Sequence, residues 1–139
     1  MSFSGFGRGA LFTPVPNPMF GPLLEQIQDL AELKVTLRGL WLFHRKRGRP
    51  QLVPLEEFLG DSTLLRGLNG PGRVPREEIQ RGLELAVVRG TLLMHRHDGP
   101  DKPNRVYALN TEVGRNLLAG LRKGEELQEM ENGTTVQIL

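Results

Sequence analysis

One stretch of the sequence, residues 75–109, decides the fold; it reads PREEIQRGLELAVVRG-TLLMHRH-DGPDKPN-RVYAL. Ile79, Leu83, Ala86 and Val87 recur at the spacing of one buried helix face, and Gly90 provides the left-handed stop that ends such a helix. Residues 91–97 and 105–109 read as short strands with period-two alternation, and the polar segment 98–104 between them is rich in turn-forming residues. The stretch therefore predicts a helix followed by a β-hairpin.

The sequence before this stretch predicts the elements that support it. Asp29 is placed to cap a central helix that ends near Gly48, with Glu32 three residues on as in a capping box. We expect the buried stripe of this helix to be formed by Leu30, Leu33, Leu37, Leu40, Trp41 and His44. A short strand at 51–53 and a helix at 55–59 follow, then a further turn of helix at 62–66 and a glycine-rich loop at 67–74. Gly82 in the third helix is expected to allow a close approach of another helix.

The order of the predicted elements is helix, small strand, helix, loop, helix, strand, hairpin tip, strand, helix. This is the order of a winged helix-turn-helix: an α+β, mostly helical fold with a small antiparallel wing sheet. The alternative is a helix packed on a hairpin in some other α+β domain. We expect a flexible arm at 1–11, a winged-helix domain at 12–122 whose last helix spans 112–121 with Thr111 as its cap, and a disordered acidic tail at 123–139.

The composition limits the possible classes of protein. The chain has 139 residues and no cysteine, which excludes disulfides, thiolate zinc sites and a cysteine nucleophile. It has no run of 18 apolar residues and no apolar core of a secretory signal, so a cytoplasmic protein is expected. The net charge of +2 hides an asymmetry, because residues 125–139 carry four glutamates and no Lys or Arg, leaving 18 basic and 12 acidic residues, a net of +6, in residues 1–124. This arginine-rich charge favours a polyanionic partner.

The basic residues suggest where DNA would bind. The third helix would enter the major groove, while the hairpin would contact the backbone or the minor groove. The expected DNA-binding residues are Arg45, Lys46, Arg47, Arg49, Arg73, Arg76, Gln80, Arg81, Arg96, Lys102 and Arg105. Two alternatives stay open. In the first, the cations at 45–49 complement the dipole at a helix C-terminus and do not contact DNA. In the second, the glutamates 77, 78 and 84 on the third helix weaken its attraction for phosphate, and the winged helix binds a protein instead.

Catalytic and metal-binding patterns are weak. The sequence has no phosphate-binding loop that ends in Gly-Lys-Ser/Thr and no Gly-x-Ser-x-Gly elbow. His95 and His97 would share one face of a strand, but two histidines without a clear third ligand do not define a metal site. The glutamate pairs at 56–57 and 77–78 lie in first helical turns, where the helix dipole accounts for them. We therefore expect no enzyme activity, no metal and no cofactor.

Four short segments resemble the N-terminal domain of DnaD-like replication-initiation (primosome) proteins: FTPVPN at 12–17, LAELKV at 30–35, GLELAVVRGTLL at 82–93 and YALNT at 107–111. The resemblance implies a winged-helix domain that mediates homo-oligomerisation and assists loading of the replicative helicase onto DNA, with replication-initiation proteins as further partners. A helical domain that binds single-stranded DNA usually follows in this family, and here the sequence ends at Leu139 without it. A protein-assembly module and a transcriptional regulator are the alternative functions.

Overall fold

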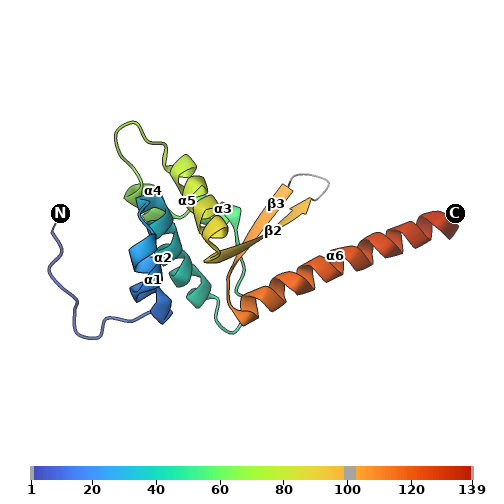
Figure 1. Cartoon of the computed structure of the whole chain (residues 1–139), viewed down its shortest axis with the longest axis horizontal. Coiled ribbons are helices and arrows are strands. Elements are labelled where there is room, and N and C mark those ends of the chain that lie inside the picture. Colours follow the sequence, from blue (N-terminus) through green and yellow to red (C-terminus); the bar gives the residue numbers. More distant parts are fainter. Residues whose placement is uncertain (1, 99–102, 139) are drawn as a thin grey trace.

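The computed structural model describes residues 2–98 and 103–138, which form an α+β fold. Its elements in chain order are η1 (Asn17–Phe20), α1 (Pro22–Gln26), α2 (Leu30–Arg45), β1 (Val53–Pro54), α3 (Leu55–Leu59), α4 (Ser62–Gly67), α5 (Pro75–Arg89), β2 (Leu92–Asp98), β3 (Pro103–Leu109) and α6 (Glu112–Ile138). Figure 1 shows α1 to α5 grouped on one side of the β2–β3 hairpin, with α6 projecting from the other side. None of the helices in the described part of the chain combines the length and apolarity that a membrane span needs.

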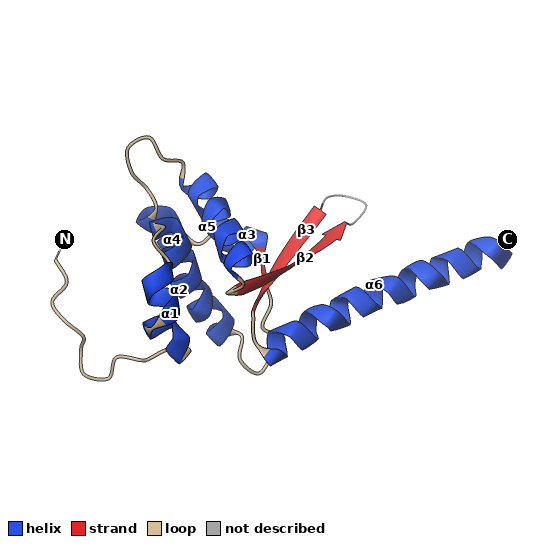
Figure 2. Ribbon diagram, viewed as in Figure 1, coloured by secondary structure: helices blue, strands red, loops and turns tan. Residues whose placement is uncertain are grey.

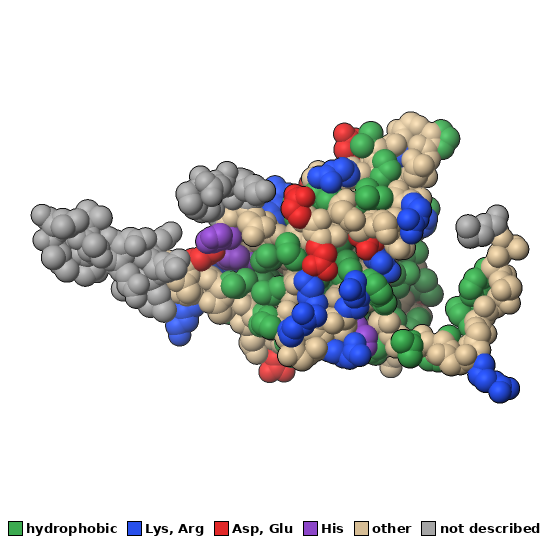
Figure 3. Space-filling view, turned by 180° about the vertical axis from the view of Figure 1, so that it is seen from behind, with side chains coloured by type: hydrophobic (Ala, Val, Ile, Leu, Met, Phe, Trp, Pro, Cys, Tyr) green, Lys and Arg blue, Asp and Glu red, His purple; other side chains and the backbone are tan. Residues whose placement is uncertain are grey.

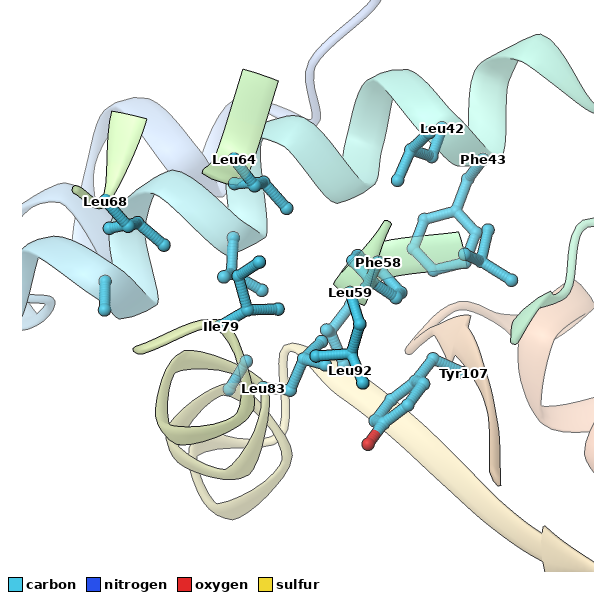
Figure 4. Close-up of a cluster of buried hydrophobic side chains, with 14 residues drawn as sticks. Leu42, Phe43, Phe58, Leu59, Leu64, Leu68, Ile79, Leu83, Leu92 and Tyr107 are labelled. Carbon is cyan, nitrogen blue, oxygen red and sulfur yellow. The ribbon is translucent and has the colours of Figure 1, made fainter. Parts of the chain in front are cut away.

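The sheet is a three-stranded antiparallel one with the order β1-β3-β2 (Figure 2). β3 is the central strand, since Val53 of β1 and Met94 of β2 both pair with Tyr107. The Tyr107 ring lies edge-on to Phe58 of α3 with 5.6 Å between ring centroids, and Phe58 in turn lies 6.4 Å from Phe43 of α2. Figure 4 shows these rings and their aliphatic neighbours converging between α2, α3 and the sheet, so one continuous core fixes the hairpin to the helices.

Helix α5 packs closely on α2. The face that its sequence predicts is confirmed, because Ile79, Leu83 and Ala86 are fully buried. Gly82 makes the close approach possible: a Cβ added to it would lie 2.6 Å from the carbonyl oxygen of Ala31. The predicted left-handed stop is also confirmed, since Gly90 has φ 93°.

The stripe predicted for α2 was wrong in part. Leu40 is buried as predicted, and Leu33, Trp41 and His44 are half-buried, but Leu30 and Leu37 are 51% and 44% exposed. The buried residues of α2 are Ala31, Glu32, Val35, Thr36, Gly39, Leu40, Leu42 and Phe43. Ala31 of α2 lies against Gly82 of α5, and two small residues at the crossing allow the helices to pack closely.

The charged residue on that face has a partner across the interface. Glu32 is only 1% exposed, and Arg89 of α5 donates to both of its carboxylate oxygens, with Nε–Oε2 and Nη2–Oε1 distances of 2.5 and 3.1 Å. Asp29 caps α2 as predicted, accepting from the Glu32 amide at 3.0 Å. The Glu32 side chain, however, bonds Arg89 rather than closing a capping box.

Several element boundaries differ from the sequence prediction. β1 is Val53–Pro54 rather than residues 51–53, and α2 ends at Arg45 rather than near Gly48. β2 keeps its predicted length but is shifted by one residue, whereas β3 begins at Pro103 rather than at residue 105 and is longer than expected. Thr111 caps α6 as predicted, with its hydroxyl accepting from the Gly114 amide at 3.1 Å. α6 then runs to Ile138, although its end was predicted at residue 121 and the tail was expected to be disordered. Residues 121–131 are mostly strong helix formers, which accounts for the continuation of the helix through Gly124.

Candidate nucleic-acid interface

The exposed face of α5 begins at its N-terminus. Val74 is the N-cap and Pro75 starts the helix, where a missing amide hydrogen costs nothing. Arg73 before the helix and Arg76 and Gln80 on it are exposed to solvent, as a groove-binding helix requires. Figure 1 shows the N-terminus of α5 and the connected ends of β2 and β3 both in the upper part of the view, on diverging axes. The N-terminal part of α5, which carries Arg76 and Gln80, therefore lies away from the bottom of the domain, as do the outer ends of the two strands.

Arg81 is already engaged within the protein. Its guanidinium binds the carboxylate of Asp29 at the start of α2 and, over 3.0 Å, that of Glu78 one turn earlier. The bonds to Glu78 and Asp29 raise the pKa of Arg81. Burial raises the pKa of Asp29, but the Glu32 amide and Arg81 outweigh it, so that the pKa lies below its ordinary value. Arg81 thus links α5 to α2, and its charge is neutralised locally.

The hairpin brings two predicted arginines together. Arg96 of β2 and Arg105 of β3 are paired in register, with Arg96 exposed and Arg105 half-buried. The two guanidinium groups therefore lie on neighbouring strands at the same level of the hairpin. Arg105 also lowers the pKa of Tyr107, although burial is the larger effect and raises that pKa overall. Lys102, the third predicted hairpin residue, lies outside the described residues.

The cluster at 45–49 closes the C-terminal end of α2. The Arg47 and Arg49 side chains donate to the carbonyl oxygens of His44 and Arg45 over 3.2 and 3.5 Å. Lys46 donates to the Leu52 carbonyl at 2.9 Å and forms an ion pair with Glu57 at 2.7 Å. These contacts are those of cations at a helix C-terminus, the open alternative for this cluster. Arg45, Arg47 and Arg49 remain exposed.

The same cluster lies at the other end of the domain from the hairpin tip. In Figure 1 the C-terminus of α2 and the loop after it are at the bottom, beside the start of α6, whereas the N-terminus of α5 is at the top. Figure 3 shows Lys and Arg side chains gathered on the lower part of the rear face. The predicted site residues therefore form two separate basic regions, one at each end of the molecule.

Two arrangements were missed by the sequence reasoning. Two guanidinium groups lie over the Trp41 ring, with Cζ of Arg38 at 3.8 Å and Cζ of Arg45 at 4.7 Å from the ring centroid. Arg38 also forms an ion pair with Asp61 at 3.0 Å, so the stack joins α2 to α4. The i, i+3 and i+4 spacing on either side of Trp41 is the signal that could have indicated this contact.

The second missed arrangement joins α6 to the hairpin. Nε2 of the buried His95 lies 2.9 Å from Oε1 of Glu125, and Nδ1 of His97 contacts the same oxygen. The bonds to His95 and then His97 hold the pKa of Glu125 below its ordinary value. The i, i+2 histidines were recognised as sharing a face, but the carboxylate that meets them is 28 residues away from His97. Within the described ranges, no group of three His, Cys, Asp or Glu side chains could hold a metal ion.

Comparison with known proteins adds no assignment: the chain matches no protein-family model, no curated protein and no solved structure.

Proposed function

We propose that this protein is a non-enzymatic DNA-binding protein of the winged-helix class. The observation that supports it best is the exposure of Arg76 and Gln80 in the N-terminal half of α5, the helix that leads directly into the β2–β3 hairpin. α5 packs against the preceding helices and leads directly into β2, and the small strand β1 pairs with β3. In this proposal α2, α4 and α5 with the β1–β3–β2 sheet form the winged helix, and β2–β3 is the wing.

Within that class, we propose a role in the initiation of DNA replication, as an accessory of primosome assembly of the DnaD-like type. The support is the resemblance of the segments at 12–17, 30–35, 82–93 and 107–111. Much of that resemblance consists of core residues in this structure, such as Ala31, Val35 and Leu83. It therefore supports the fold more strongly than the replication role.

The proposed interface is smaller than the full set of basic residues. α5 would present Arg76 and Gln80 to the major groove, with Arg73 on the adjacent backbone. The Arg96–Arg105 pair would contact phosphates beside it. Arg81 would act as a positioning residue through its ion pairs, and the cluster at 45–49 would lie away from this duplex contact. Glu77 and Glu84, both exposed on α5, limit the affinity for phosphate.

The experiment measures affinity for duplex DNA by fluorescence anisotropy at low and moderate salt. The wild type should lose affinity as salt rises, with a logarithmic slope of about −0.9 for each phosphate contact. Arg76→Ala with Arg105→Ala should weaken binding by about tenfold or more and reduce the slope by about 2. The matched control, Arg47→Ala with Arg49→Ala, removes the same charge from the opposite end and should leave binding nearly unchanged. Undetectable binding of the wild type at low salt refutes the DNA-binding proposal.

A second candidate function, a protein-assembly module, is favoured by a different observation. The N-terminal arm carries four large apolar side chains that are almost fully solvent-exposed: Phe3 at 74%, Phe6 at 88%, Leu11 at 98% and Phe12 at 90%. Such a concentration of exposed apolar surface is typical of a segment that binds another protein. Removing residues 2–12 would abolish partner capture under this candidate and would leave DNA affinity unchanged under the first.

A further inference from the structure

The loop that follows α2 is held in place at both ends. The Lys46 side chain donates to the Leu52 carbonyl at 2.9 Å, and the Gln51 side chain donates back to the last turn of α2, also over 2.9 Å. Between these contacts Gly48 has φ 82°, a left-handed conformation that favours glycine and turns the chain at this point. The backbone on both sides of Gly48 is therefore ordered before any partner binds, which lowers the entropic cost of binding.

Three arginines on and beside this loop carry charge that the protein itself does not neutralise. Lys46 is paired with Glu57 at 2.7 Å. Arg45, Arg47 and Arg49 are exposed, and none of them forms an ion pair in the described part of the chain. The bonds of Arg47 and Arg49 to backbone carbonyls use one N–H donor of each guanidinium, so further donors stay available. The loop thus presents positive charge and unused donors on a fixed backbone.

A groove with an apolar floor begins beside these arginines. Arg47, Arg49 and Gln51 line one side of a depression of about 490 Å³, and Val113 and Leu117 of α6 line the other side. A second depression of about 440 Å³ shares Gln51, Val113 and Leu117 with the first, so the two are continuous. The apolar side chains that line this second part are Pro14, Val15, Pro16, Leu40, Phe43 and Leu109. Among the described residues that line either depression there is no Asp or Glu.

The floor of the groove is open to solvent on the α6 side. Val113 is 59% exposed, and Leu117 one turn later is half-buried. The other side of this helix is used internally, because Gly114 and Leu118 are buried. Figure 1 shows the loop after α2 beside the start of α6 at the bottom of the domain, away from the N-terminus of α5. Occupation of the groove therefore leaves the proposed duplex contact at Arg76 accessible and does not depend on it.

We propose that this groove binds a short acidic segment of another protein, in which carboxylate and apolar side chains alternate. Charge complementarity identifies the occupant, because exposed arginines without ion pairs border a groove that no acid lines. Carboxylates of the segment pair with Arg47 and Arg49, for which the planar guanidinium is well suited. Apolar side chains of the same segment enter the depression over Leu40 and Leu109, where they remove apolar surface from water.

Nucleic acid matches the rim of the groove but not its floor. The backbone of a duplex offers phosphates to the arginines and no apolar group to the depression. A single strand binds by stacking its bases on exposed aromatic rings, whereas the phenylalanine that lines this groove, Phe43, is only 3% exposed. The acidic and apolar segment satisfies both parts of the groove at once.

The first experiment measures the binding of a short fluorescein-labelled peptide, in which Glu alternates with Leu and Phe, to the full chain by fluorescence anisotropy. One control peptide carries Lys in place of every Glu, and another carries Ser in place of every apolar residue. The wild type should bind the acidic, apolar peptide about tenfold more tightly than either control, or better. No binding at about 100 μM protein, or equal binding of the Ser control, overturns the proposal.

The second experiment exchanges the charge of the groove. Arg47→Glu with Arg49→Glu should weaken binding of the acidic peptide by about tenfold or more and should make the Lys peptide the preferred ligand. Val113→Asp should also weaken binding while both arginines are kept. The matched control, Arg73→Glu with Arg76→Glu, makes the same charge change at the other end and should weaken only the binding of duplex DNA. Peptide affinity that neither groove variant changes overturns the proposal, whatever the DNA result.

Competition tests the other possible occupants. Single- and double-stranded oligonucleotides should not displace the peptide from the wild type. Displacement by an oligonucleotide that itself loses affinity on Arg47→Glu with Arg49→Glu would assign the groove to nucleic acid. An oligomer of the wild type that the same variant dissociates would assign it to a second copy of the chain, and either result overturns the acidic segment as the occupant.

Discussion

Replacing Gly82 by alanine tests the contact that holds α5 against α2. An added Cβ would lie 2.6 Å from the carbonyl oxygen of Ala31 and 2.9 Å from Cγ2 of Val35, so the two helices would have to separate. Overpacking of this kind costs about 1–3 kcal/mol, and the clash with backbone places this site in the upper part of that range. Alanine returns about 1 kcal/mol of helix propensity. The net expectation is a loss of about 1–2 kcal/mol in the free energy of unfolding.

Gly39 on α2 provides the matched control. Its added Cβ would lie 3.5 Å from the nearest atom of Phe58, which is ordinary van der Waals contact. Gly39→Ala should therefore raise the free energy of unfolding by up to about 1 kcal/mol. Urea unfolding followed by circular dichroism measures both, and Gly82→Ala should lower the midpoint by about 0.5–1 M. A Gly82→Ala variant as stable as the wild type, or more stable, would show that α2 and α5 do not approach as closely as described.

Three further outcomes are expected. Arg89→Ala leaves the buried carboxylate of Glu32 without its partner and should lower the urea unfolding midpoint, whereas the additional change Glu32→Leu should recover most of that loss; no recovery would contradict the burial of the carboxylate. The pKa of Glu125 is depressed in the folded state. The contribution of its carboxylate to the free energy of unfolding is therefore present above the ordinary glutamate pKa of 4.5 and is lost as pH falls through the lower folded value. The stability difference between wild type and Glu125→Gln should therefore vanish in acid, and a difference independent of pH would argue against the contact with His95. Tyr107 is the single tyrosine, so ultraviolet titration of the chain should give a midpoint above 10.0, and a midpoint at or below that value would contradict its burial.

Much of the helical half of the fold could be predicted because its signals are local. The caps at Asp29 and Thr111 depend on a side chain and an amide three residues later, and the stop at Gly90 depends on one residue's backbone freedom. The buried face of α5 followed from the 3.6-residue period. Each of these features is set within a few residues of chain.

The candidate site was only partly predictable, because the exposure of each basic side chain and the ion pairs that it forms depend on residues far apart in sequence. Nothing near Arg81 in sequence indicates that Asp29, 52 positions earlier, engages its guanidinium. The same is true of Glu125, which meets His97 from 28 residues away. The division of the basic residues into two regions depends on how α2 and α5 are placed relative to each other, and no local sequence pattern indicates that placement.

The sequence by itself determined which segments up to residue 121 are helical or extended, where they begin and end to within a few residues, and which residues carry positive charge, but it missed the continuation of α6 to Ile138. These properties follow from local backbone preferences and from periodicity. Only the tertiary structure decided that Ala31 and Val35 of α2 are buried while Leu30 and Leu37 are exposed, because that choice depends on how closely Gly82 lets α5 approach. It also decided which cations are committed to internal ion pairs and which remain exposed, because the energy of each charge depends on neighbours that folding brings together.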